Sequence, residues 1–376
     1  MTPNFTFSLS ALALTLLTTQ ALSQVYNIPA QPIPGALSNT QWISGPSAFD
    51  SPKNNPLNET AYDWWYFDIV SEPDANGQQP SFAASFHTTG TDGFDPLHGA
   101  IPGPYPSQTF VQIDLAWPDG ETEAWILVAG DSTITVKGDG ASGNFSGTGC
   151  AFHGAPDLSW YTIDVDAPEQ GIVGSFQVLS NAPAHYPCGP AEAGQDLHIV
   201  PGAGWINAVP DGPAAVDFDI HGREFKFQGR GYHDHNFGNR AFSSALAASY
   251  WGHGRIADYV VVWADMLTPS GANHLTSYVA QNGEILTAEC SGIRVRPYGE
   301  NSTYPPTTTT GSPTGFHLEV NIPEGLLELQ AETIYVTVAS SFYHRFTGRF
   351  TGSLNGVPLQ DGIALWEQFT LQEGDE

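Results

Sequence analysis

Short apolar or alternating runs, each closed by Gly, Pro, Asn or Asp, follow one another along most of this chain. Residues 109–117 (TFVQIDLAW), 160–165 (WYTIDV) and 173–178 (VGSFQV) are typical examples. Alternation with a period of two residues, bounded by turn residues, predicts β-strands. The 40 glycines and 29 prolines leave little room for long helices, and only residues 240–251 have a short helical pattern. The sequence therefore predicts an all-β protein.

The strand pattern divides the chain into two parts. A second series of strands begins near residues 216–220 and includes 259–263. A chain of roughly 350 residues exceeds what one hydrophobic core usually organises, so we expect two domains, each a sandwich or closed barrel. The Pro/Gly-rich segment 201–213 is the best linker candidate. We predict an N-terminal domain over residues 24–214 and a C-terminal domain over residues 215–376.

The N-terminus has the features of a signal peptide. An apolar stretch from Leu9 to Leu17 precedes Ala21-Leu22-Ser23, a small-residue pattern before a cleavage site at Gln24. No later segment contains the ~20 apolar residues that a bilayer-spanning helix needs, so we expect no stable membrane anchor. We predict a signal peptide over residues 1–23 and a protein that is secreted or located in the lumen of the secretory pathway or of vesicles.

Export would expose the chain to glycosylation and to an oxidising compartment. The mature chain contains three Asn-x-Ser/Thr sequons, at Asn58, Asn144 and Asn301. Three cysteines allow one disulfide, and we expect Cys150 to pair with Cys188 because both lie in the first half. Sequence does not fix the connectivity, and the alternative is three buried free thiols, including Cys290.

The charge excludes two classes of partner. The formal net charge is -28, with 11 Lys+Arg against 39 Asp+Glu. Nucleic acids and anionic membranes are bound largely through Lys and Arg, so neither is an expected partner. All eight arginines lie at or after Arg223, and only Lys53 and Lys137 precede it. The two halves therefore differ in character, and the oligomeric state stays open.

The densest cluster of chemically active side chains is the run 229–238, GRGYHDHNFG. In an extended strand, His233 and His235 would share one face while Asp234 and Asn236 share the other. Three interpretations remain open. The His-x-His spacing could bind a metal, although no second cluster supplies a third ligand. The run could instead provide an acidic or hydrogen-bonding site, or a buried polar network that joins the two domains.

Asp234 is the candidate acid of this run. Aromatic surroundings would remove its solvation and raise its pKa, so that it could donate a proton or a hydrogen bond near neutral pH. An ion pair with Arg230 or Arg240 would have the opposite effect on the pKa. Both possibilities remain open.

A second cluster is the aromatic run 62–68, YDWWYFD. Such runs are commonly core, because each aromatic side chain buries ~150–250 Å². The polar atoms of Asp63, Trp65 and Tyr66 favour a ligand-facing role, since they would otherwise need buried partners. These side chains could line an apolar small-molecule pocket together with three further tryptophans, Trp251, Trp263 and Trp366.

Several common chemistries lack their motifs. The chain has no Gly-x-Ser-x-Gly elbow, no phosphate-binding Gly-Lys-Ser/Thr loop, no His-Glu-x-x-His and no Gly-x-Gly-x-x-Gly after a strand. With three lysines, a Schiff-base mechanism is not expected. Paired-carboxylate glycosidase chemistry stays possible in principle, but no spacing selects a pair.

Three segments carry a resemblance to a known family. They are the run Asp63-Trp-Trp-Tyr-Phe-Asp68, the run from Gly231 to Gly238, and the late Leu365-Trp-Glu367. In their order and spacing, which cover essentially the whole mature chain, they resemble the carotenoid hydratase (hydroxyneurosporene synthase)-like superfamily and, more closely, its fungal Diels-Alderases. Phe237 departs from the hydratases, which usually have Trp there.

The resemblance implies an N-terminal β-sandwich, a C-terminal lipocalin-like antiparallel β-barrel and an active site between them. It also implies cycloaddition of small apolar substrates in polyketide or terpenoid pathways, without metal or organic cofactor. The signal peptide and sequons set this chain apart from the decalin-forming members. It looks like the exported branch, hetero-Diels-Alderases that join a tropolone-derived quinone methide to a humulene-type sesquiterpene.

We expect protonated Asp234, or His233, to donate a hydrogen bond to the carbonyl of the heterodiene. The expected substrate-binding residues are Asp63, Trp65, Tyr66, His235, Asn236, Trp251, Trp263 and Trp366. Two other classes of function remain open. One is a hydratase or isomerase acting on a terpenoid or polyene alkene, and the other is a non-catalytic lipocalin-like protein that binds apolar ligands.

Overall fold

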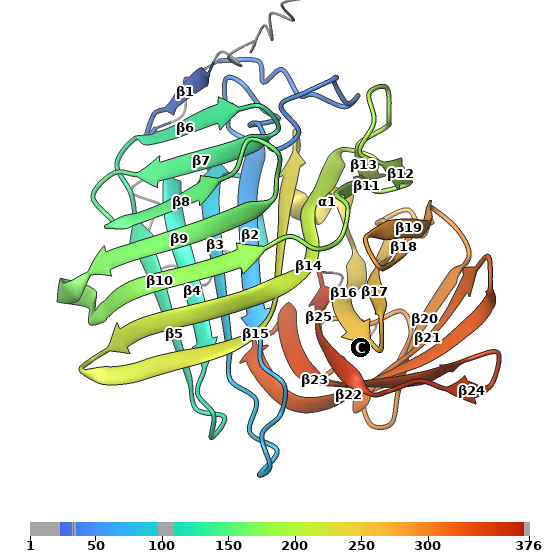
Figure 1. Ribbon diagram of the computed structural model, residues 1–376. Coiled ribbons are helices and arrows are strands. Elements are labelled where there is room, and N and C mark those ends of the chain that lie inside the picture. Colours follow the sequence, from blue (N-terminus) through green and yellow to red (C-terminus); the bar gives the residue numbers. More distant parts are fainter. Residues whose placement is uncertain (1–22, 32, 34, 97–108, 372–376) are drawn as a thin grey trace, which may run out of the picture.

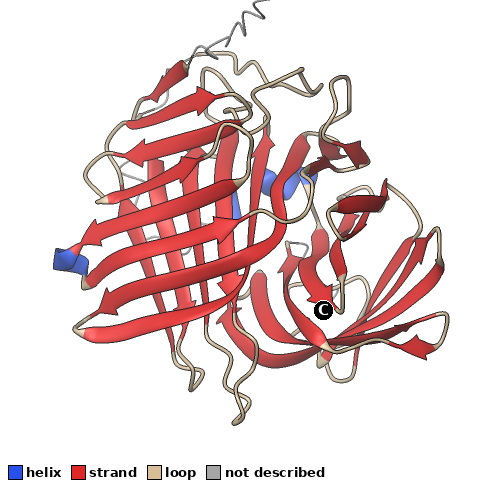
Figure 2. Cartoon of the chain, in the orientation of Figure 1, coloured by secondary structure: helices blue, strands red, loops and turns tan. Residues whose placement is uncertain are grey.

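The computed structural model describes residues 23–31, 33, 35–96 and 109–371. Apart from Ser23, the predicted signal peptide lies outside these residues. The regular secondary structure of the described part is almost entirely antiparallel strand, which confirms the all-β prediction (Figure 2). The 3₁₀-helix η2 (Pro168–Gln170) and the α-helix α1 (Phe242–Ala245) are each about one turn long. The helix expected over residues 240–251 is therefore mostly wrong, because a strand begins at Ala248.

The first sheet has 15 strands, in the order β1-β6-β7-β8-β9-β10-β14-β15-β2-β3-β4-β5, with β11, β12 and β13 beside this path. Its strands are β1 (Gln24–Ile28), β2 (Tyr62–Val70), β3 (Ser81–Thr89), β4 (Thr109–Ala116), β5 (Thr122–Val128), β6 (Ser132–Lys137), β7 (Gly140–Phe145), β8 (Cys150–Gly154), β9 (Trp160–Ala167), β10 (Ile172–Leu179), β11 (His185–Tyr186), β12 (Gly189–Pro190), β13 (His198–Val200), β14 (Ala203–Ile220) and β15 (Arg223–Gly238).

This sheet folds onto itself as a sandwich. Strands β6 to β10 cross in front of β2, β3 and β4 (Figure 1). The side chains between the two layers form one core, in which the rings of Phe67 (β2) and Phe152 (β8) have centroids 5.5 Å apart. Alternate residues of a strand point to opposite faces. The side chains on one face of β2 therefore belong to this core, and those on the other face point away from it.

The second sheet has 10 strands, in the order β19-β18-β17-β16-β25-β23-β22-β21-β20, with β24 beside β23. Its strands are β16 (Ala248–Ile256), β17 (Tyr259–Leu267), β18 (Asn273–Gln281), β19 (Glu284–Glu289), β20 (Ile293–Tyr298), β21 (Gly315–Ile322), β22 (Gly325–Ala339), β23 (Tyr343–Leu354), β24 (Val357–Pro358) and β25 (Gly362–Thr370). The sheet curls until β20 lies against β17 and β18, which gives the expected antiparallel barrel. Its interior is filled by apolar side chains such as Trp263, Phe346 and Trp366.

The change from one sheet to the other lies between Gly238 and Ala248, not near residue 214. Residue 214 is inside β14, which pairs with β15 along nearly its whole length. Of the segment 201–213, residues 203–213 belong to this strand and are nearly all buried, so the segment is not a linker. Its register shifts between Asn207 and Gly212, around Pro210. A proline lacks the N–H that a regular ladder needs, and a bulge accommodates it.

The disulfide prediction is wrong. Cys188 pairs with Cys290, with Cα atoms 4.8 Å apart, and Cys150 is a buried free thiol. Cys150 begins β8 inside the core of the sandwich, whereas Cys188 lies in the turn between β11 and β12, beside β19. The disulfide therefore ties the first sheet to the barrel, a contact between segments 102 residues apart in sequence.

The three sequon asparagines differ in exposure. Asn144 and Asn301 are exposed, whereas Asn58 is partly buried and its side chain accepts hydrogen bonds from the backbone N–H groups of Thr60 and Ala61. No helix in the described ranges is long and apolar enough to cross a membrane.

Candidate active site

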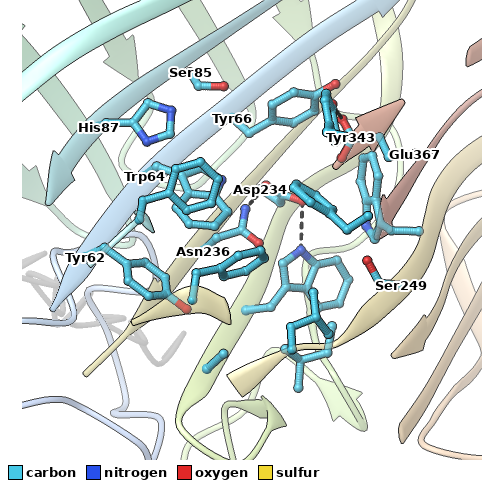
Figure 3. A pocket seen from close by; sticks show the side chains of 18 of the residues that line it. Tyr62, Trp64, Tyr66, Ser85, His87, Asp234, Asn236, Ser249, Tyr343 and Glu367 are labelled. Atoms are coloured by element: carbon cyan, nitrogen blue, oxygen red, sulfur yellow. Dashed lines mark hydrogen bonds between the residues drawn. The ribbon is translucent and has the colours of Figure 1, made fainter. Parts of the chain in front are cut away.

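A cavity of about 220 Å³ lies between the first sheet and the barrel, where the family resemblance implied a site. Aromatic side chains from both sheets form much of its wall (Figure 3). The principal ones are Tyr62, Trp64 and Tyr66 from β2, Trp205 from β14, Phe242 from α1 and Trp251 from β16. A concave, mostly apolar space with a few fixed polar groups is the usual form of a small-molecule site.

Strand pairing sets the polar groups of this cavity in rows. On the first sheet, Asp234 of β15 lies opposite Tyr66 of β2, which lies opposite Ser85 of β3. In the next row, Asn236 of β15 lies opposite Trp64 of β2. Residues directly opposite each other on antiparallel strands point to the same face, so each row faces the cavity together.

Among the carboxyl groups that line the cavity, Asp234 accepts the most hydrogen bonds. Its side chain is 2% exposed. Oδ2 accepts hydrogen bonds from Trp205 Nε1 at 2.8 Å and from Tyr232 Oη at 3.0 Å, and Oδ1 accepts one from Asn236 Nδ2 at 2.7 Å. Figure 3 shows Asp234 and Asn236 in the middle of the aromatic side chains. These three donors fix the orientation of the carboxyl group.

Burial raises the pKa of Asp234 to about 8, even though the hydrogen bonds from Trp205 and Tyr232 lower it. The negative charges of Glu367 and Asp68 raise it further. At neutral pH the protonated form therefore dominates, and a neutral carboxyl group can donate a hydrogen bond. Of the two sequence-based alternatives, the structure supports the acid. Among the described residues Asp234 forms no ion pair with Arg230 or Arg240, and Arg230 bonds to Asp211 instead.

The barrel supplies a second polar group of residues, on β23 and β25. Arg345 Nε donates to Glu367 Oε1 at 3.1 Å, and its Nη1 donates to Asp114 Oδ2 at 3.2 Å. Tyr343 Oη also donates to Glu367 Oε1. Burial raises the pKa of Glu367, while the charge of Arg345 lowers it and offsets part of this effect.

Three hydrogen-bond donors in the cavity wall lack partners among the described residues. They are Tyr62 Oη, Tyr66 Oη and Trp251 Nε1, all buried. A buried polar group without a hydrogen bond costs about 1–3 kcal/mol, so such groups are uncommon in folded proteins. These atoms are suited to bind oxygen atoms of a ligand.

Four of the predicted site residues lie on the other face of these strands. His233, His235, Asp63 and Trp65 are all buried in the sandwich, away from the cavity. His233 Nε2 lies 3.2 Å from Asp50 Oδ2, and His235 Nε2 lies 2.9 Å from Asp63 Oδ1. The prediction that they contact a substrate is therefore not supported, because the pleat turns them into the sandwich core.

These residues form a buried polar network instead. A buried network was one of the alternatives for this run, but it was expected to join the two domains, whereas this one lies within the sandwich. Burial disfavours the charged carboxylate of Asp50, but the neighbouring His233 and His235 outweigh this effect and lower its pKa. Burial likewise opposes protonation of His235, and its bonds to Asp50 and Asp63 outweigh that and raise its pKa. Lys53 is also buried here, and its Nζ donates to the backbone oxygen of Phe49 at 2.7 Å. The network holds the N-terminal segment on the sandwich.

Two predicted pocket tryptophans are core residues of the barrel. Trp263 and Trp366 are each 1% exposed and pack with Phe346 and Phe350. Tyr66, Asn236 and Trp251 do line the cavity, as expected.

Several residues that line the cavity were not predicted from the sequence. Trp205 lay in the segment interpreted as a linker, and Tyr343 and Arg345 have no distinctive motif. Glu367 follows Trp366, and alternation along β25 would have indicated that only one of the two faces the cavity. Among the described residues, no group of three or more His, Cys, Asp or Glu side chains is arranged to hold a metal ion.

The chain is similar to proteins of known family. The model of the Diels-Alderase-like family matches residues 25–293. The quinolone epoxide rearrangement protein penF of Penicillium thymicola is 32% identical over 93% of this chain and 96% of its own length. The Diels-Alderase cheD of Chaetomium globosum is 25% identical over 63% of this chain and 54% of its own length.

The fold of this chain is similar to that of a solved structure. The crystal structure of CghA with Sch210972 matches with a TM-score of 0.75 at 20% identity, over 93% of this chain and all of that chain. The family includes Diels-Alderases and epoxide rearrangement proteins, so its members are enzymes of pericyclic or rearrangement chemistry. The match to the family model over most of the chain, together with the penF similarity, shows that this chain belongs to the Diels-Alderase-like family.

Proposed function

We propose that this protein is a cofactor-independent hetero-Diels-Alderase that joins a tropolone-derived quinone methide to a humulene-type sesquiterpene. The observation that carries the proposal is the buried carboxyl group of Asp234 in the wall of an aromatic cavity, where burial raises its pKa to about 8. In this proposal Asp234 donates a hydrogen bond to the carbonyl oxygen of the heterodiene.

The cavity can accelerate a cycloaddition in two ways. Binding both partners in one orientation replaces a bimolecular encounter, and well-oriented reactions reach effective molarities on the order of 10⁵–10⁸ M. A fixed hydrogen-bond donor stabilises the negative charge that develops on the carbonyl oxygen in an asynchronous transition state. Asp234 is fixed by Trp205, Tyr232 and Asn236, so it needs little reorganisation during the reaction.

Epoxide rearrangement is a second candidate, favoured by the similarity to penF over nearly the full length of both chains. In that reaction the C–O bond of an epoxide would break while its oxygen takes the proton of Asp234. The Asp234 carboxylate would then recover a proton from solvent or from the rearranged product. The same residue therefore serves both reactions, and the substrate distinguishes them.

The test uses the mature protein with two substrate sets: a quinone-methide precursor with humulene, and a quinolone epoxide. Products are separated by chiral chromatography and compared with a reaction without enzyme, because spontaneous cycloaddition is expected. A faster reaction with a changed stereochemical ratio supports the first candidate. A spontaneous ratio and rate refutes it, and conversion of the epoxide alone supports the second.

Two variants connect the result to the site. Asp234→Asn removes the acid, and Asp258→Asn makes the same change at an exposed position of the barrel. Only the first should lose activity, by roughly 10²-fold or more if a proton is transferred.

We also propose that the protein is exported. The disulfide between Cys188 and Cys290 supports this, since such bonds persist in oxidising compartments. The exposed sequons at Asn144 and Asn301 would be glycosylated there, which a mobility shift after glycosidase treatment would reveal.

A further inference from the structure

Trp251 and Glu367 lie side by side on the barrel wall of the cavity. They are directly opposite each other in the pairing of β16 with β25, and both line the cavity. Residues so paired have Cβ atoms about 4.5–5.5 Å apart and point to the same face. One side chain offers a donor and the other an acceptor.

The donor is the indole N–H of Trp251. Nε1 is buried and has no hydrogen-bond partner in the described ranges. The ring is held perpendicular to Tyr66, with centroids 5.8 Å apart, and packs on Tyr232 at 5.2 Å. An indole nitrogen can only donate, so a ligand that satisfies it must present an acceptor.

The acceptor is Oε2 of Glu367. Tyr343 and Arg345 both donate to Oε1, and in the described part of the chain no hydrogen bond is made to Oε2. The contact with the Arg345 guanidinium favours the ionised carboxylate, which accepts hydrogen bonds and donates none. A ligand that satisfies Oε2 must therefore present a donor.

We propose that Trp251 and Glu367 together select substrates that carry an acceptor and a donor on neighbouring atoms, as in a hydroxy ketone or a secondary lactam. The acceptor oxygen would take the Trp251 N–H, and the O–H or N–H would donate to Glu367. The inference rests on the proposed function, because it takes the cavity as the substrate site.

Such a pair discriminates strongly against compounds that lack the donor. A methylated analogue would place a methyl group against a largely buried carboxylate and leave that carboxylate without its partner. Sites built to hydrogen-bond a polar group reject analogues without it far more effectively than apolar pockets reject a change of size. The carbon skeleton would be held by the aromatic wall.

Binding of four small probes tests the proposal. Tropolone is compared with 2-methoxytropone, and 2-quinolinone with N-methyl-2-quinolinone, by equilibrium dialysis. Tropolone is measured at several pH values to obtain the affinity of its neutral form. We expect at least one parent compound to bind about tenfold more tightly than its methylated partner, the effect of one hydrogen bond to a charged group. The pair with the larger preference identifies whether the natural group is a hydroxy ketone or a lactam.

Variants then attribute the preference to the pair. In Glu367→Gln the preference for the parent compound should disappear, and in Glu367→Asp, which keeps the charge but withdraws the carboxylate, it should fall several-fold. Trp251→Phe should weaken a parent compound and its methylated partner by a similar factor. Glu332→Gln, the same change at an exposed residue of β22, should leave all affinities unchanged.

Equal binding of parent and methylated probes by the wild-type protein would overturn the proposal. An undiminished preference in folded Glu367→Gln or Glu367→Asp would do the same. These measurements involve no turnover, so they are separate from the activity assay: loss of the proposed function would appear there, while failure of this inference appears only as lost discrimination between probes.

Discussion

His233 and Asp234 are neighbours in the chain, but their side chains lie on opposite faces of β15. His233 contacts Asp50 in the sandwich core, and Asp234 lines the cavity and bonds to Trp205. Two adjacent residues of one strand are therefore a structural group and the candidate acid. Substituting one should have different consequences from substituting the other.

The reaction should depend on pH through Asp234. Its pKa is raised from 3.8 to about 8 by burial, so the donating form dominates below that pH and is lost above it. We expect kcat/KM to be level in the neutral range and to fall about tenfold per pH unit above pH 8. A pH–rate profile of the wild-type protein checks this. The profile of Asp234→Asn should lack that decline, and its persistence would mean that another group is responsible.

Trp205 should tune this acid without reacting. Its indole N–H donates to Asp234 Oδ2 and lowers the pKa of the carboxyl group. Trp205→Phe should therefore move the decline of the pH–rate profile to higher pH. Trp125→Phe is the matched control, because that indole donates to the backbone oxygen of Gln170 and Trp125 does not line the cavity. A shift to lower pH in Trp205→Phe would contradict the role given to this bond.

His233 should be a stability residue. Removing it in His233→Ala leaves the buried Asp50 carboxylate without one of its partners, and breaking a buried pair costs about 3–5 kcal/mol. The free energy of unfolding, from denaturant titration, should fall by that amount. His153→Ala breaks an exposed pair with Asp164 and should cost less than about 1 kcal/mol. Comparable small losses in both variants would argue against the network.

The disulfide should stabilise the junction of the two sheets. Cys188→Ala should lower the free energy of unfolding by about 2–4 kcal/mol, since the bond closes a loop of 102 residues. Thermal unfolding with and without reductant checks the pairing. Wild type and Cys150→Ala should both lose stability on reduction, and Cys188→Ala should not respond. A response that depends on Cys150 would restore the pairing expected from sequence.

Local pattern was enough to predict much of this molecule. The alternation over residues 62–68 and 229–238 gave strands and separated Asp234 and Asn236 from the two histidines, because a pleated strand turns successive side chains to opposite faces. It also indicated an all-β chain of two parts. The family resemblance added the sandwich and the barrel, and it implied a site between them, where the candidate cavity lies.

Only the tertiary structure determined which strand face lines the cavity and which side chains come into contact there. The partners of Asp234 include Trp205, 29 residues away, and the Arg345–Asp114 ion pair joins residues 231 apart. The disulfide likewise joins residues distant in sequence, because Cys188 pairs with Cys290 of the barrel, 102 residues away. The two-residue period of a strand predicts that its two faces differ. Which face belongs to the core and which lines the site is determined by the packing of sheets that are distant in sequence.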